Sequence, residues 1–185
     1  MQSLTPPQLD EPLVILVDQN DNEIGVAPKL QAHIDGVLHR AFSVFIFNSK
    51  NELLLQQRAI EKYHSGGLWT NSCCSHPMPG ETTEAAAHRR LVEEMGFDCA
   101  LDHAFGFVYR TDFENGLTEH EYDHVFFGHY EGDFQVNYEE VASTRWITLG
   151  DLDTWMATKP EDFTFWFKHI YDQVKAHLAK KGGHA

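Results

Sequence analysis

An amphipathic helix with a marked start and a marked end is the feature that most constrains how this chain can fold. Residues 81–84 read Glu-Thr-Thr-Glu, a pattern typical of the first turn of a helix. Gly96 supplies the residue at which helices commonly end. Between these signals, apolar residues recur at helical spacing, so we predict a helix with one buried face. The recurring residues are Ala85, Ala86, Ala87, Leu91, Val92 and Met95.

Short apolar segments separated by turn residues predict a sheet beside this helix. Residues 13–17 read as a strand, and the Asp/Asn-rich residues 18–22 read as a turn, which favours a hairpin near the start. A second hairpin is predicted from the apolar residues 41–47, a turn at 48–51 and a return strand at 53–57.

The remaining elements complete an α/β pattern. With helices on the outside of the strands, we expect an α/β sandwich in a single domain over residues 1–185, with a flexible segment at 1–12 and a frayed tail at 180–185. Further strands are predicted at 105–110, 122–130 and 145–149, and helices at 151–157 and 163–178. The last helix carries a stripe of Phe163, Phe167, Ile170, Val174 and Leu178.

Composition limits the classes of partner. The chain of 185 residues is 42% hydrophobic, which allows one domain with a sizeable core. A net charge of −14 argues against nucleic acid and anionic membranes, because both need a positive surface. With no membrane-length apolar run and no signal-peptide pattern in residues 1–12, we expect a cytoplasmic protein. Three cysteines without a Cys-x-x-Cys pair favour reduced thiols.

The densest group of reactive residues is the segment 68–77, Leu-Trp-Thr-Asn-Ser-Cys-Cys-Ser-His-Pro. It places Cys74 two residues before His76. A thiol can act as a nucleophile or as an acid/base when an imidazole, a metal or a helix N-terminus favours its thiolate. The Cys-x-His spacing is weak by itself, and its interpretation depends on other residues of the chain.

Carboxylates and imidazoles elsewhere suggest a metal site. Glu119 and Glu121 would point to the same side of a strand, since strand side chains repeat every two residues. Considered singly, each acid or imidazole is better explained as a solvated or turn residue. Together, three imidazoles and two carboxylates would fill five positions of an octahedral divalent ion such as Zn, Mn, Fe or Mg. The imidazoles are His33, His39 and His76.

The helix offers a second group. Arg90 and Glu94 are four residues apart on one face, a spacing that is most often a surface ion pair. The functional alternative is that Glu94 holds Mg²⁺ while Arg90 binds phosphate oxygens. Lys29, Arg58 and Lys62 could complete a basic island, although each alone reads as a solvated charge.

Residues 75–97 resemble a Nudix box, G-x5-E-x7-R-E-U-x-E-E-x-G-U with U apolar. Ser75 replaces the first glycine, and Arg90 replaces the glutamate after the arginine. That glutamate helps to bind the catalytic metal in Nudix hydrolases, so Arg90 disfavours a hydrolase. The matching residues are Glu81, Arg89, Leu91, Val92, Glu93, Glu94, Met95, Gly96 and Phe97.

With these two departures, the chain resembles the type I isopentenyl-diphosphate Δ-isomerases. Three strings of residues add to this resemblance: Leu-His-Arg-Ala-Phe-Ser at 38–43, Trp-Thr-Asn-Ser-Cys-Cys-Ser-His-Pro at 69–77, and Glu119-x-Glu121. The resemblance runs from about Lys29 to Trp166. It implies a Nudix-type α/β/α sandwich with a mixed central sheet. It also implies the interconversion of isopentenyl and dimethylallyl diphosphate.

The resemblance assigns roles residue by residue. It makes Cys74 and Glu121 the acid/base pair, with Tyr109 assisting and Trp166 facing the hydrocarbon. One divalent metal (Mn, Mg or Zn) would be held by His33, His39, His76, Glu119 and Glu121, with Cys74 in the same group. Glu94 would hold the Mg²⁺ of the diphosphate, and the diphosphate itself would meet Lys29, Arg58, Lys62 and Arg90.

The reaction requires acid/base groups on both sides of the substrate. Moving a double bond means adding a proton at one carbon and removing another two carbons away, through a cation-like species. A dry cavity would protect that cation, and the indole of Trp166 or Trp69 could stabilise it. The alternatives are a Nudix pyrophosphohydrolase acting on a nucleoside diphosphate derivative and a non-catalytic Nudix module. We expect a monomer or weak dimer whose ligand is a small isoprenoid diphosphate.

Overall fold

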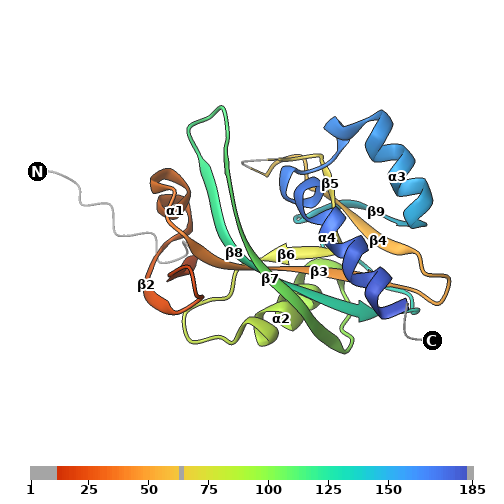
Figure 1. Ribbon diagram of the computed structural model, residues 1–185, viewed down its shortest axis with the longest axis horizontal. Coiled ribbons are helices and arrows are strands. Elements are labelled where there is room, and N and C mark those ends of the chain that lie inside the picture. The colour runs from red at the N-terminus through yellow and green to blue at the C-terminus, as the bar shows by residue number, and fades with distance from the viewer. Residues whose placement is uncertain (1–11, 63–64, 183–185) are drawn as a thin grey trace, which may run out of the picture.

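The computed structural model describes residues 12–62 and 65–182, which form one mixed sheet with helices on both faces (Figure 1). The central strand is β3 (His39–Phe47), and seven of its nine residues are buried. Along one edge it pairs in parallel with β8 (Thr118–His129). This continuous pairing fixes which side chains of the two strands meet.

The other edge of β3 meets three strands in turn. It pairs with β1 (Leu13–Val17) at its start, with β6 (Cys73–Ser75) in the middle and with β4 (Leu53–Arg58) at its end. The remaining strands are β2 (Glu23–Pro28) beside β1, β5 (Trp69–Thr70) and β9 (Val141–Ile147) beside β4, and β7 (Leu101–Asp112) beside β8. The pairs β1–β2 and β3–β4 are the two predicted hairpins.

Helix α2 (Thr83–Met95) covers one face of the sheet and has the predicted ends. The Thr82 side chain accepts a hydrogen bond from the backbone N–H of Ala85, and Gly96 ends the helix with a φ of 78°. Its fully buried residues, including Leu91 and Met95, pack with apolar side chains of β3 and β6. Burial of one such side chain stabilises the fold by about 2 kcal/mol.

Helices α3 (Leu149–Thr158) and α4 (Phe165–Gly182) cover the other face (Figure 1). Phe167, Ile170 and Val174 of the predicted stripe are buried there. Phe163 is buried too, although it precedes the helix in an extended conformation after a 3-10 turn, η1 (Pro160–Asp162). Of the predicted terminal segments, residue 12 and residues 180–182 are described, the latter as helix, and residues 1–11 and 183–185 lie outside the described residues.

Helix α1 (Lys29–Asp35) was not predicted from the sequence. It has seven residues and no side-chain cap, so it carries no strong local signal. Beside it, β7 and β8 form a long hairpin that rises between α1 and α4 (Figure 1). Strand β8 begins at Thr118, four residues before the predicted start, so that its charged first half belongs to the sheet.

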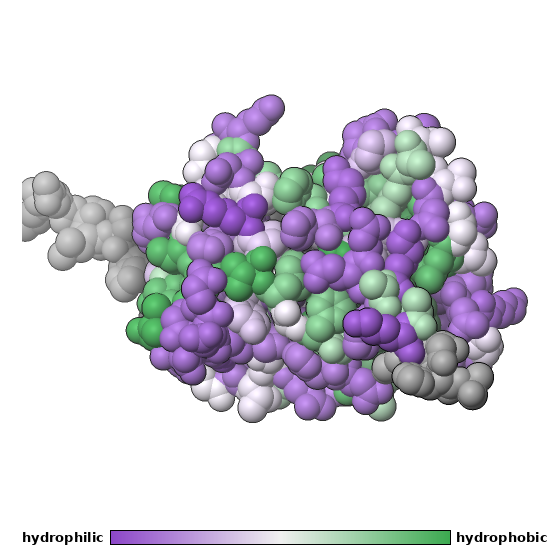
Figure 2. All heavy atoms as spheres, in the orientation of Figure 1, coloured by the Kyte–Doolittle hydropathy of each residue, from purple (hydrophilic) through white to green (hydrophobic). Residues whose placement is uncertain are grey.

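The surface is mostly hydrophilic in the view of Figure 2, with apolar side chains gathered near β2 and α1. Ile24 and Val26 of β2 and Ile34 of α1 are exposed members of this group. None of the helices in the described part of the chain combines the length and the apolar character that a membrane span requires.

Candidate active site and metal centre

Strand register brings the central side chains of the site together. His39 on β3 lies opposite Glu121 on β8, and Tyr109 on β7 lies opposite Glu121 from the other side. Directly paired residues point to the same face of a sheet. Three strands therefore aim an imidazole, a carboxylate and a phenol at one place.

Four side chains form a group that could hold a metal ion: His33, His39, His76 and Glu119. Their donor atoms all lie within 4.8 Å of one another. His33 comes from α1, His39 opens β3 and His76 follows β6. The Nε2 atom of His33 is 3.1 Å from Oε1 of Glu119. Three imidazoles and a carboxylate suit a divalent ion of borderline hardness.

The tautomer of His39 fits a ligand role. Its Nδ1–H donates to the backbone carbonyl of Val37 at 3.0 Å, so the free electron pair is on Nε2. That Nε2 atom is buried, has no hydrogen-bond partner among the described residues and lies 3.8 Å from Oε2 of Glu121. Backbone bonding at one ring nitrogen commonly orients the other nitrogen toward a metal.

Burial disfavours the charged form of His33 and His76. Burial lowers the pKa of His33 to about 4 and that of His76 to about 3. Burial also raises the pKa of Glu119, and the neighbouring carboxylate of Glu121 adds to the effect. Neutral imidazoles beside two close carboxyl groups form a donor set that a cation would stabilise.

Beside this group lies a cavity. Glu121 accepts a hydrogen bond from the Tyr109 hydroxyl, and His76 Nε2–H donates to its other oxygen at 3.0 Å. The Cys74 thiol reaches the cavity from β6, and burial raises its pKa to about 12. The cavity is lined by Lys29, Ala41, Phe42, Ser43, Arg58, Lys62, Cys74, Ser75, His76, Arg90, Glu94, Tyr109, Glu119, Glu121, Asp123 and Trp166.

The basic side chains of this lining are held by nearby groups. The Arg58 guanidinium carbon lies 5.1 Å from the centre of the Trp166 ring. Lys62 forms an ion pair with Glu140, and Arg90 Nη2 is 3.5 Å from the same carboxylate oxygen. Arg90 also lies 3.6 Å from Oε1 of Glu94.

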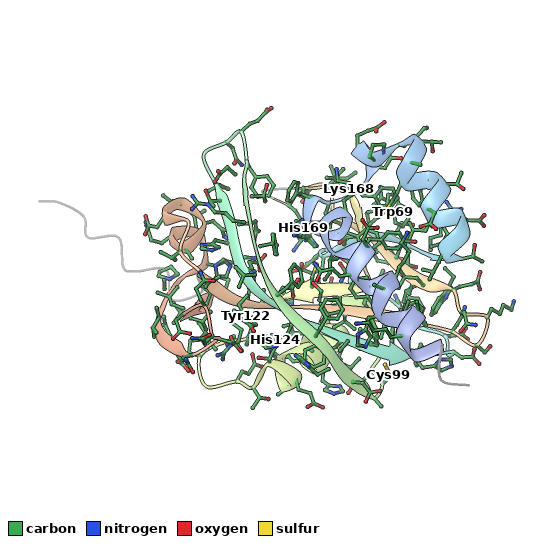
Figure 3. The ribbon with its side chains drawn as sticks, viewed as in Figure 1. Trp69, Cys99, Tyr122, His124, Lys168 and His169 are labelled. Carbon is green, nitrogen blue, oxygen red and sulfur yellow. The ribbon has the colours of Figure 1, made fainter. Side chains whose placement is uncertain are left out.

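The structure thus brings the predicted site residues together in the metal group and the cavity. His33 and His39 belong to the metal group and are not among the cavity-lining residues, while Cys74 and Glu121 line the cavity and are outside the four-donor group. Trp69 packs against Trp155 at 5.6 Å near α3, outside that lining (Figure 3).

Sequence reasoning missed two charged residues. Asp123 lines the cavity and accepts a hydrogen bond from Ser43 at 2.7 Å, and its Oδ1 atom is buried without a hydrogen-bond partner in the described structure. The alternation of Glu119 and Glu121 continues to Asp123 and could have revealed it. Glu140 gave no comparable local signal, because its partners Lys62 and Arg90 are far away in the sequence.

Comparison with known proteins identifies the family. The model of the NUDIX domain family matches residues 37–167. The chain is 53% identical over 161 residues to an isopentenyl-diphosphate Delta-isomerase of Pectobacterium atrosepticum, covering 87% of this chain and 90% of that protein. The chain belongs to the isopentenyl-diphosphate Delta-isomerases of the NUDIX family.

Further relatives agree with this family. Isopentenyl-diphosphate Delta-isomerase 2 of Aromatoleum aromaticum is 52% identical over 164 residues, covering 89% of this chain and 87% of that protein. The solved MutT NUDIX hydrolase of Burkholderia pseudomallei shares the fold with a TM-score of 0.59 at 21% identity, covering 74% of this chain and 98% of that one. The predicted family and α/β fold are confirmed.

Proposed function

We propose that this chain interconverts isopentenyl diphosphate and dimethylallyl diphosphate by adding a proton at one carbon and removing another two carbons away. The observation that carries the proposal is the joint placement of the Cys74 thiol and the Tyr109–Glu121 pair in one cavity with four basic side chains. Acid/base groups can serve the hydrocarbon while the basic side chains bind the diphosphate. The names of its relatives support the same reaction.

The acid/base pair begins with one proton donor and one acceptor. Burial keeps Cys74 protonated, since its pKa is about 12. Burial also opposes ionisation of Glu121, but hydrogen bonds from Glu119 and His76 hold its pKa well below the usual range. Two acid/base groups thus lie in one cavity, as is required to add one proton to the substrate and to remove another.

The cation-like species needs a dry environment and a π face. Trp166 is 5% exposed and lines the cavity at the start of α4. An indole face can stabilise a desolvated cation by about 2 kcal/mol. Arg58 lies over this ring, and a bound diphosphate would compete for the guanidinium and release the indole for the reacting carbons.

Two metal sites complete the proposal. One divalent ion, Mn, Mg or Zn, would be held by His33, His39, His76, Glu119 and Glu121, with Cys74 beside them. Such an ion supplies positive charge that makes nearby groups more acidic. Glu94 would hold a Mg²⁺ that joins the protein to the diphosphate oxygens. Lys29, Arg58, Lys62 and Arg90 would bind the diphosphate.

The proposal also covers the pathway, the location and the assembly of the chain. We place the chain in isoprenoid biosynthesis, in the cytoplasm, as a monomer or weak dimer in a single domain. The acidic composition supports a small-molecule ligand over nucleic acid or an anionic membrane.

The test is to incubate the purified chain with Mg²⁺ and isopentenyl diphosphate and to follow carbon and phosphorus NMR signals. We expect dimethylallyl diphosphate with the diphosphate intact. A parallel incubation with a nucleotide sugar should leave its pyrophosphate bond intact, with no nucleoside monophosphate or sugar phosphate formed. Hydrolysis of the nucleotide sugar without isomerisation would instead establish a pyrophosphohydrolase.

A further inference from the structure

The second thiol of the Cys73–Cys74 pair has a polar partner of its own. Successive residues of a strand point to opposite faces, so Cys74 reaches the cavity while Cys73 points under α2. Cys73 is fully buried, and its Sγ donates to Oε2 of Glu94 at 2.8 Å. The thiol is thus more than an apolar filler of the core.

Glu94 uses its two carboxylate oxygens differently. It lies near the end of α2, is 4% exposed and lines the cavity. Oε2 is on the core side with Cys73, and Oε1 is 3.6 Å from Nη2 of Arg90. A buried carboxylate oxygen that loses its donor is left unsatisfied, which is unfavourable, so the thiol favours this one orientation.

We propose that Cys73 is a positioning residue that fixes the Glu94 carboxylate so that Oε1 is presented to the Mg²⁺ carried by the diphosphate. The inference rests on the proposed function, in which Glu94 holds that ion. Groups that orient a ligand commonly change metal affinity by about 10–100-fold when they are removed.

The test measures metal binding without turnover. Mn²⁺ is titrated by electron paramagnetic resonance with and without inorganic diphosphate, and the diphosphate-dependent Mn²⁺ reports on Glu94. Cys73→Val keeps the approximate size and removes the donor, so its Kd for this Mn²⁺ should rise about 10-fold or more. Cys73→Ser keeps a donor and should restore the Kd to within about threefold of wild type.

Two comparisons separate positioning from packing. Cys99 is a half-buried thiol that lies just before β7 and outside the cavity (Figure 3). Cys99→Val makes the same change there and should leave this Kd unchanged. In a Glu94→Gln background, Cys73→Val should have no further effect, because the carboxylate that it positions is gone. In turnover, Cys73→Val should raise the Mg²⁺ concentration for half-maximal rate more than it lowers kcat.

A Cys73→Val variant that binds the diphosphate-dependent Mn²⁺ as tightly as wild type would overturn the proposal. An undiminished effect of Cys73→Val in the Glu94→Gln background would also overturn it. These outcomes do not depend on isomerisation. A wild-type chain that fails to isomerise therefore contradicts the proposed function without deciding the role of Cys73.

Discussion

At the residue scale, neighbouring side chains of one strand have different tasks. Cys73 and Cys74 are adjacent, yet one is in the core beneath α2 and the other lines the cavity. Similarly, Glu121 points to the cavity, while His124 on the opposite face of β8 bonds to Asp21 at 2.7 Å (Figure 3). A strand of mixed polarity can thereby supply a reactive surface and a structural surface at once.

Cys74→Ala should lower kcat about 10²-fold or more, because removal of an acid/base group typically costs that much. Cys73→Ala should keep most of the rate at saturating Mg²⁺. Steady-state rates with isopentenyl diphosphate check both. Equal losses in the two variants would contradict the assignment of Cys74 as the reacting thiol.

Trp166→Phe should retain more activity than Trp166→Leu, since only Phe keeps a π face toward the reacting carbons. A full cation–π contribution of about 2 kcal/mol corresponds to about a 30-fold difference in kcat. The comparison is made at saturating substrate, so that changes in KM do not enter. Equal kcat values for Phe and Leu would rule out a π contribution.

At the element scale, local signals predicted some elements and missed others. Helix α2 was predicted because its cap, its periodicity and Gly96 all lie within the element. Helix α1 and strand β6 have seven and three residues and depend on tertiary contacts for their conformation. The alternation that predicted Glu119 and Glu121 is local, whereas the contacts of Glu140 are set by the fold. Their functional roles stay predictions.

The end of α2 provides a test of tertiary constraint. Gly80 and Gly96 both have positive φ, at 84° and 78°, so alanine is strained at either by about 1 kcal/mol. A Cβ added at Gly96 would also lie 2.0 Å from the Gln135 carbonyl oxygen. A Cβ added at Gly80 would have no heavy atom of the described residues within 4 Å beyond its chain neighbours. Gly96→Ala should therefore lower Tm more than Gly80→Ala, which should cost about 2–4 °C. Equal losses would contradict the close approach.

At the scale of the whole molecule, the metal group joins α1, β3, β8 and the segment after β6. Its residues come from segments far apart in the sequence, so the site forms only when the sheet has assembled. An ion bound to this group would couple folding to metal binding and would stabilise the native state by mass action.

The buried imidazoles predict a pH dependence of stability for the metal-free chain. Unfolding returns His76 from a pKa of about 3 to about 6.5, so the unfolded state binds more protons between these values. The contribution of His76 to stability is thus lost as pH falls below 6.5. Relative to wild type, His76→Gln should become more stable by about 2 kcal/mol between pH 7 and pH 5. Urea denaturation at both values checks this, and a constant difference would contradict it.

The most direct test of the central claim is the fate of protons in D₂O. If a proton is added at one carbon and another is removed two carbons away, dimethylallyl diphosphate formed from isopentenyl diphosphate should carry deuterium on its carbon skeleton. Mass spectrometry and deuterium NMR of the product measure this, with the diphosphate expected to remain intact. Product without carbon-bound deuterium, or phosphate released as fast as substrate is lost, would contradict the account.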